Sequence, residues 1–215
     1  MRFADTMELG RWRSEVREFV RANWGSADEG SEFFPLMGHW DESRVPRWLD
    51  ALGSRGWIAA AWPKEYGGAD LSMLEQFILT QEITSVGAPT SRRMLNLVGP
   101  TIMLHGTAEQ KAEYLPPMLR GETAWCQGFS EPGAGSALAS LRTSAVRDGD
   151  DYVVNGQKIW TSGAHESDWM FMLVRTDSAA PKHRGITYLL VDMKSAGIQV
   201  RPLLSLDGGH WFNEV

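Results

Sequence analysis

Residues Cys126–Ser136, with the sequence CQGFSEPGAGS, form the most unusual stretch of the chain. An apolar, strand-like beginning leads into a glycine-rich loop, and glycine lets a backbone approach a ligand closely. Ser130 and Ser136 place a hydroxyl at either end of this loop. A dinucleotide-binding fingerprint is excluded, because Gly133 and Gly135 follow a proline and no βαβ unit surrounds them. The composition therefore predicts either a ligand-binding loop or a tight turn in solvent.

A second stretch, Asn155–Gly163 (NGQKIWTSG), places Trp160 directly before two hydroxyl residues, Thr161 and Ser162. A tryptophan at the end of a strand, followed by hydroxyls, can provide a stacking surface with hydrogen-bond donors beside it. The alternative is a core tryptophan followed by a polar turn. Both interpretations remain open at this point.

The residues up to 121 follow helical patterns. Trp12, Val16 and Val20 recur at helical spacing, with Asp5 or Thr6 as a cap before them. The later helices are expected to begin at Pro46, at a capping box Ser72–Glu75 and at a capping box Thr107–Gln110, and to end near Gly53, Gly87 and Gly121. Pro116 and Pro117 are expected to break or restart the last helix. Residues 1–121 are thus predicted to form an all-helical domain.

The period changes after residue 121. Short strands are expected over 141–147, 152–155, 157–161, 169–175, 186–191 and 198–201. Asp148–Asp150 and Asn155–Gly156 are hairpin signals between them. Regularly spaced strands without intervening helices predict an antiparallel barrel or sandwich over residues 122–215. The predicted fold class is therefore α+β, a helical domain followed by a β domain.

The overall composition is that of an ordinary globular protein: 215 residues, 43% hydrophobic and 22% charged. A net charge of -6 leaves no overall basic field for nucleic acid or anionic lipid. The apolar runs are far too short to span a membrane, and the N-terminus lacks the apolar core of a signal peptide. Cys126 is the single cysteine, which favours a reducing cytoplasm. No metal site is expected, because the histidines are scattered.

Six segments together resemble the acyl-CoA dehydrogenase family, flavoproteins that oxidise an acyl thioester between its α and β carbons. They occur in the family's order and at its spacing: Trp62–Gly68 (WPKEYGG), Gly99–Thr101 (GPT), Gly106–Lys111 (GTAEQK), Tyr114–Pro116 (YLP), Ser130–Ser136 (SEPGAGS) and Asn155–Trp160 (NGQKIW). The resemblance implies a helical domain, a middle β domain and a C-terminal four-helix domain. The first two correspond to the halves predicted above, and the third is absent from this chain.

The resemblance also implies an FAD site. The flavin-binding residues would be Gln127, Gly128, Phe129, Ser130, Gly135, Ser136, Trp160, Thr161 and Ser162. The Phe129 backbone and the Ser130 hydroxyl would bond the pyrimidine edge of the flavin. Trp160 would pack on the ring and the Ser162 hydroxyl would approach N5. Ser136 resembles the family serine that binds the acyl-pantetheine arm of the substrate.

Departures from the family bear on catalysis. Ala137 stands where the family usually has Asp, and Ser130 replaces the commoner Thr. No Glu or Asp here matches the family's catalytic-base positions, and Glu131 belongs to the loop motif. The chain also ends at Val215, inside an expected strand. We therefore expect the base in a C-terminal part beyond these residues, and the segment alone to be inactive.

The resemblance further implies an acyl-CoA substrate, an electron-transfer flavoprotein as electron acceptor, and a homo- or hetero-tetramer. Two other functions remain open. The chain could be a non-catalytic partner subunit of a hetero-oligomeric dehydrogenase, for which Ala137 is the supporting feature. It could also keep the fold and carry out nitroalkane oxidation or flavin monooxygenation. The sequence leaves the length and type of the acyl group open.

Overall fold

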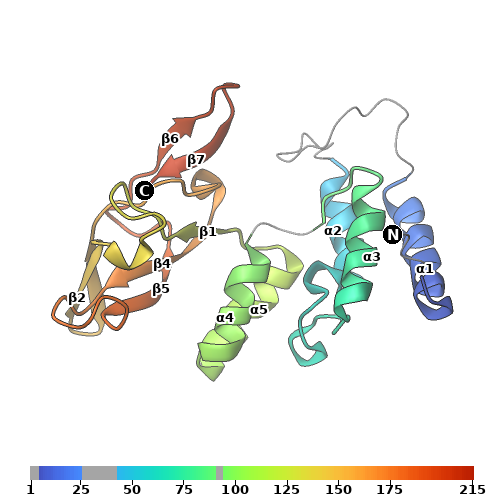
Figure 1. Ribbon diagram of the computed structural model, residues 1–215, viewed down its shortest axis with the longest axis horizontal. Coiled ribbons are helices and arrows are strands. Elements are labelled where there is room, and N and C mark those ends of the chain that lie inside the picture. The colour runs from blue at the N-terminus through green and yellow to red at the C-terminus, as the bar shows by residue number, and fades with distance from the viewer. Residues whose placement is uncertain (1–4, 26–42, 91–93) are drawn as a thin grey trace. The chain divides into compact units, whose positions relative to one another are not determined.

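The computed structural model describes residues 5–25, 43–90 and 94–215. The chain divides into two compact units, Met1–Glu122, which we call the helical unit, and Thr123–Val215, which we call the β unit (Figure 1). The α+β fold class predicted from the sequence is confirmed. No helix in the described ranges is long and apolar enough to cross a membrane.

Within its described residues, the helical unit contains five α-helices, which begin largely where the sequence predicts. Their bounds are α1 Met7–Asn23, α2 Val45–Ser54, α3 Met73–Thr84, α4 Leu95–His105 and α5 Ala108–Arg120, with short 3-10 turns at Trp57–Ala59 and Lys64–Tyr66. Thr6 caps α1, and both predicted capping boxes, at Ser72 and Thr107, are present with their reciprocal hydrogen bonds. These caps satisfy backbone N–H groups that the first helical turn leaves without partners.

One expectation about α5 is wrong, because this helix runs without a break through Pro116 and Pro117. A proline ring fixes φ near its helical value and removes one N–H donor. The carbonyls that lose their donors belong to Ala112 and Glu113, which lie on the exposed side where water can replace the bond. The helix then ends at Gly121, whose φ of 69° is left-handed.

An aromatic cluster and a buried carboxylate hold α1 against the rest of the helical unit. Phe19 packs edge-on against Trp57 with ring centroids 4.6 Å apart, and it also lies beside Trp48. Glu82 of α3 is buried and accepts hydrogen bonds from Arg13 and Arg17 of α1. The hydrogen bond from Arg17, with that from Arg13, lowers the pKa of Glu82 despite its burial.

The β unit is built around one central strand, β4. The strands are β1 Trp125–Gly128, β2 Ser144–Asp148, β3 Asp151–Asn155, β4 Trp169–Arg175, β5 Ile186–Asp192, β6 Arg201–Leu204 and β7 His210–Glu214, with 3-10 turns at Leu138–Ser140 and Ala164–Glu166. β5 pairs with the whole of β4 in antiparallel fashion, whereas β1 pairs with it in parallel. β6 and β7 form a separate antiparallel pair.

The expected antiparallel barrel or sandwich differs from the structure in two respects. The five-stranded sheet is mixed, because β1 and the start of β2 both run parallel to β4. No sheet closes on itself within the described part of the chain. A parallel pair needs a long connection between its strands, and here the forty residues from β1 to β4 supply it through loops and a hairpin.

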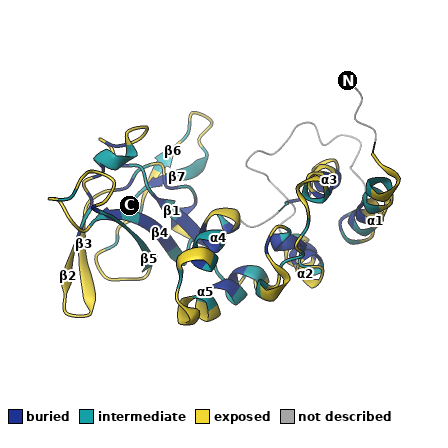
Figure 2. Cartoon of the chain, turned by 60° about the horizontal axis from the view of Figure 1, so that its bottom comes forward, coloured by how far each residue is buried: buried dark blue, intermediate teal, exposed yellow. Residues whose placement is uncertain are grey.

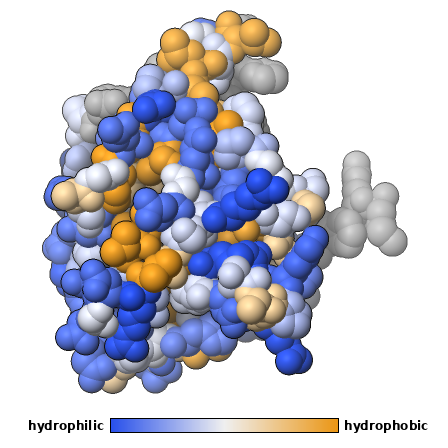
Figure 3. Space-filling view, turned by 90° about the vertical axis from the view of Figure 1, so that its left-hand side faces the viewer, coloured by the Kyte–Doolittle hydropathy of each residue, from blue (hydrophilic) through white to orange (hydrophobic). Residues whose placement is uncertain are grey.

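The first predicted hairpin, β2–β3, is present, and Gly149 takes the left-handed φ of 63° in its turn. Most of the hairpin is exposed in Figure 2, including Val146 and Val153. Figure 3 shows further apolar patches between hydrophilic areas on the outer face of the β unit. The second predicted hairpin, at Asn155–Gly156, is wrong. Gly156 instead lies against Thr143, where an added Cβ would sit 2.4 Å from the threonine hydroxyl oxygen.

Candidate functional site

The site begins where β1 ends. β1 is buried beside β4, and the chain then turns through Glu131–Ala134, whose two backbone groups bond each other at 2.8 and 3.0 Å. Pro132 and Gly133 form the exposed tip of this turn. An added Cβ on Gly133 or on Gly135 would meet nothing within 4 Å. The loop therefore leaves open space beside its backbone, as a ligand-binding loop requires.

A buried ion pair between Lys158 and Glu131 holds this loop in place. The Lys158 Nζ lies 2.8 Å from the Glu131 Oε1 and also donates to the carbonyls of Leu173, at 2.7 Å, and Phe129, at 3.3 Å. The other Glu131 oxygen accepts the Arg142 N–H at 2.6 Å. Every charge in this pair thus has several partners, which buried charges require.

Hydrogen bonds keep both groups ionised despite their burial. Burial alone would raise the pKa of Glu131, but the hydrogen bonds from Lys158, Thr143 and the Arg142 N–H lower it to about 2. Burial lowers the pKa of Lys158, and the hydrogen bond with Glu131 opposes that shift. The lysine stays charged because three oxygens surround its ammonium group. Glu131 is therefore a structural carboxylate and no proton acceptor near neutral pH.

The segment after Gly156 is bonded to β7 through a bulge. Lys158 and Val215 exchange both backbone hydrogen bonds, and so do Thr161 and Asn213. Three steps along one segment therefore match two steps along the other, which is the count of a β-bulge. The extra residue is accommodated at Trp160, whose φ of 60° is left-handed. A bulge of this kind turns a side chain out of the sheet, and Trp160 as a residue is 60% exposed.

The two quoted stretches meet at this bulge. The Ile159 N–H donates to the Ser130 carbonyl at 2.9 Å, next to the contacts between Lys158 and Glu131. The glycine-rich loop and the exposed tryptophan are thereby joined through neighbouring residues of each segment. The structure thus brings together Phe129, Ser130 and Trp160, which the sequence separates by about thirty positions.

The remaining predicted residues lie in different environments. The Thr161 side chain is fully buried, and an added Cβ on Gly128 would meet the Met170 sulfur at 2.5 Å. These two residues would reach a ligand through backbone atoms. Gly135 and Ser136 are exposed in the loop, and Gln127 and Ser162 are half-buried.

Several hydrogen-bond donors of the site have no protein partner. Among the residues that the structure describes, neither the N–H nor the hydroxyl of Ser162 bonds another group, and the Ser130 hydroxyl has none either. Donors left open beside an exposed aromatic ring are suited to a planar ligand with acceptor atoms at its edge. The arrangement is therefore a candidate surface for a heteroaromatic ligand.

A cluster that sequence analysis missed lies behind this surface. The rings of His165 and His210 stack with centroids 3.8 Å apart, and both contact the side-chain amide of Asn213. No local pattern signals the cluster, because its members come from the turn after Gly163 and from β7. Other chemistry is limited in the described residues: no group of three or more metal-ligating side chains is present. Burial raises the pKa of the Cys126 thiol to about 11, so this cysteine is not a nucleophile.

Both units of the chain match domains of a known enzyme family. The sequence of residues 6–122 matches the acyl-CoA dehydrogenase N-terminal domain, and residues 126–212 match the acyl-CoA dehydrogenase middle domain. The chain therefore belongs to the acyl-CoA dehydrogenase family.

Similar proteins are found among curated sequences and solved structures. Acyl-CoA dehydrogenase FadE26 of Mycobacterium tuberculosis is 42% identical over 97% of this chain and 53% of its own length. The ChsE4-ChsE5 complex from the same species matches with a TM-score of 0.80 and 38% identity, covering all of this chain and 54% of that one. A Tcur3481-Tcur3483 steroid ACAD matches with a TM-score of 0.78 and 37% identity, over 100% and 55%. The chain thus spans about half the length of these relatives.

Proposed function

We propose that the chain supplies the flavin-binding face of an FAD-dependent acyl-CoA dehydrogenase. The observation that supports this most directly is the joint between the Ser130 loop and the Trp160 bulge. That joint presents an exposed ring and unpartnered donors on one surface. Family membership supports the same cofactor, because the family consists of flavoproteins.

The residues fit an isoalloxazine ring on their own chemistry. Trp160 offers a flat aromatic surface, and Ser130 and Ser162 offer hydroxyl and N–H donors to the nitrogen and oxygen atoms at the ring's edge. When bound, FAD supplies the hydride acceptor for oxidation of the acyl group. Donors held in place before binding stabilise negative charge that develops on a ligand, and they need no reorganisation to do so.

The acyl thioester would lie along the exposed end of the same loop, with Ser136 bonding its pantetheine arm. A base must remove the α proton while hydride leaves the β carbon. The two buried carboxylates of the described residues, Glu82 and Glu131, are both engaged in ion pairs. We therefore expect the base from another part of the same protein or from a partner chain. The electron acceptor would be an electron-transfer flavoprotein.

The alternative function is that of a partner subunit in a hetero-oligomeric dehydrogenase. Two of the solved relatives are named as assemblies, ChsE4-ChsE5 and Tcur3481-Tcur3483. In such an assembly this chain could bind flavin or acyl-CoA while its partner supplies the base. Because one of these relatives is called a steroid ACAD, steroid-derived acyl thioesters belong among the candidate substrates beside fatty acyl thioesters. A homo- or hetero-tetramer is the proposed assembly.

The test uses the full-length protein, produced alone and with any chain encoded beside it. Bound FAD is quantified, and anaerobic bleaching of the flavin is followed with a panel of fatty and steroid-derived acyl-CoA thioesters. We expect stoichiometric FAD and bleaching by at least one thioester. Ser162→Ala should weaken FAD binding or slow bleaching, whereas Ser178→Ala, in an exposed loop, should change neither. A wild-type protein that takes up no FAD in either preparation would contradict the proposal.

A further inference from the structure

The side chain of Asn213 is fully buried and bonds the segment that follows Trp160. Its Nδ2 lies 3.0 Å from the Thr161 carbonyl and 3.1 Å from the His165 Nδ1, and its Oδ1 lies 2.7 Å from the His210 Nε2. A backbone carbonyl only accepts hydrogen bonds, so the amide atom facing Thr161 must be the NH₂ group. The orientation of the amide is thus fixed by this one contact.

This orientation determines which ring nitrogens carry protons. The NH₂ group has its second hydrogen left for the His165 Nδ1, which must therefore be an unprotonated acceptor. The Asn213 Oδ1 accepts, so the His210 Nε2 must carry a hydrogen. The proton of His165 then resides on Nε2, which faces the Glu166 carboxylate at 3.6 Å. The stacked rings are thus two distinct partners, one accepting from Asn213 and one donating to it.

The Thr161 carbonyl accepts two hydrogen bonds from the same residue, because the Asn213 backbone N–H also donates to it at 3.1 Å. In a planar trans peptide the carbonyl and the next N–H point in opposite directions. Fixing the Thr161 carbonyl toward β7 therefore aims the Ser162 N–H away from β7. That N–H has no acceptor in the described part of the chain.

We propose that Asn213, held by His165 and His210, is a positioning residue that fixes the Thr161–Ser162 peptide for contact with the flavin. The inference rests on the proposed function only for the identity of the ligand. In this proposal the three side chains act through the peptide and not by contact with the flavin. They act by keeping the Ser162 N–H in one direction before the ligand arrives, which is the preorganisation that a binding site needs.

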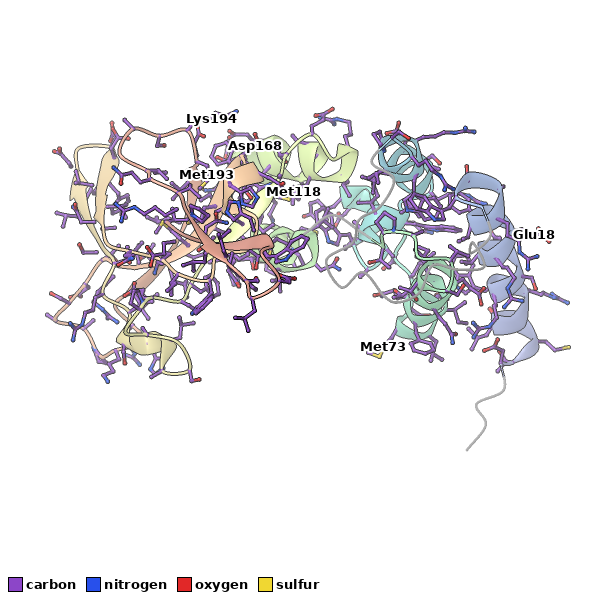
Figure 4. The ribbon with its side chains drawn as sticks, turned by 90° about the horizontal axis from the view of Figure 1, so that it is seen from above. Glu18, Met73, Met118, Asp168, Met193 and Lys194 are labelled. Atoms are coloured by element: carbon purple, nitrogen blue, oxygen red, sulfur yellow. The ribbon has the colours of Figure 1, made fainter. Side chains whose placement is uncertain are left out.

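The two histidines of the cluster lie beside an open cavity, so they can be substituted more safely than the fully buried Asn213. His165, His210 and Asn213 line an open cavity of about 280 Å³, together with Met193 and Lys194. Figure 4 shows Met193 and Lys194 close to Asp168 in the β unit. The Lys194 side chain is 80% exposed and contacts Asp168 at 3.5 Å. It lines the same cavity without bonding Asn213, and it is therefore the matched control.

The test compares substitutions that keep each hydrogen bond with substitutions that remove it. In His165→Asn the amide oxygen can replace the accepting Nδ1, and in His210→Gln the amide NH₂ can replace the donating Nε2. His165→Leu and His210→Leu remove those bonds. Two sets of measurements are made on the full-length protein. The first is hydrogen exchange at the Thr161 and Gly163 amides without FAD, and the second is the midpoint potential and reduction rate of the bound flavin.

We expect these amides to exchange about tenfold faster in the leucine variants, which corresponds to the loss of roughly one hydrogen bond. The flavin of these variants should be reduced about tenfold more slowly, for the same reason, and its midpoint potential should shift. The asparagine, glutamine and Lys194→Gln variants should stay within about threefold of wild type. Leucine variants that match wild type in both measurements would overturn the inference. Asn213→Asp should give the largest effect, and if it does not fold, the histidine pairs decide. If wild type binds no FAD, the proposed function fails, while the exchange rates still decide whether the cluster fixes this peptide.

Discussion

The ammonium nitrogen of Lys158 lies 2.8 Å from a carboxylate oxygen of Glu131, and both side chains are almost completely buried. Each residue belongs to a different one of the two stretches that form the candidate site. The same lysine also bonds the Phe129 carbonyl, and its neighbour Ile159 bonds the Ser130 carbonyl. The ion pair therefore holds the glycine-rich loop against the segment that contains the Trp160 bulge.

Replacing Lys158 by methionine should strongly destabilise the β unit. The change leaves the Glu131 charge buried without its cation, and breaking one side of a buried ion pair typically costs about 3–5 kcal/mol. The free energy of unfolding, measured by urea denaturation with circular dichroism, should fall by that amount, and FAD binding should be lost. The double variant Lys158→Met with Glu131→Leu removes both charges and should recover part of the stability. A single variant as stable as wild type would show that the pair does not hold the loop.

The same pair predicts a loss of stability in acid. Hydrogen bonds to Glu131 outweigh its burial and lower its pKa to about 2 in the folded protein, below the ordinary value of about 4.5. A lowered carboxyl pKa contributes stability above the unfolded value, and this contribution is lost as the pH falls toward the folded one. The free energy of unfolding should therefore fall between about pH 4.5 and pH 2, and this fall should be smaller in Glu131→Gln. Equal slopes in the two proteins would assign the acid sensitivity to other carboxyls such as Glu82.

The features predicted from sequence are those set by neighbouring residues. The capping boxes at Ser72 and Thr107 depend on pairs three positions apart, and both are present. The β2–β3 hairpin depends on Gly149, which has the required φ. The prediction that Pro116 and Pro117 break the last helix is wrong, because whether a proline breaks a helix depends on the exposure of the carbonyls it leaves without donors. Exposure is a property of the folded chain.

The site was predicted only in part for the same reason. The glycine-rich loop and Trp160 could be chosen by composition and by family resemblance. The bulge at Trp160 could not, because it depends on register against β7, about fifty residues later. The same distance in sequence hides the contacts of Asn213 with Thr161 and His165. The parallel pairing of β1 with β4 likewise has no local signal.

The left-handed backbone at Trp160 predicts that stability and ligand binding can be separated. A non-glycine residue at positive φ costs about 1–2 kcal/mol, and the largely exposed ring keeps an edge-on contact with Phe212. Trp160→Gly should relieve that strain at an entropic cost to folding, so the free energy of unfolding should stay within about 1 kcal/mol of wild type. Its affinity for FAD should fall tenfold or more, because aromatic stacking of this kind contributes about 1–3 kcal/mol.

Trp160→Phe keeps an aromatic ring and the same backbone strain, so it should retain most of the FAD affinity. Isothermal titration with FAD and urea denaturation of the apoprotein measure the two quantities separately. A glycine variant that binds FAD as tightly as wild type would remove Trp160 from the flavin surface.

Gly99 in α4 should be intolerant of even one methyl group. An added Cβ would lie 1.9 Å from Cζ2 of the Trp62 ring, which is buried in the helical unit and has little room to move. Forcing a group into such a packed site costs about 1–3 kcal/mol, and more where the neighbour is a rigid ring.

Gly10 in α1 is the matched control, because an added Cβ there meets nothing within 4 Å. Gly10→Ala should raise the free energy of unfolding by about 0.5–1 kcal/mol through helix propensity, whereas Gly99→Ala should lower it. Urea denaturation followed by tryptophan fluorescence distinguishes the two, and a Gly99→Ala variant as stable as wild type would mean that α4 and Trp62 do not pack as closely as the structure shows.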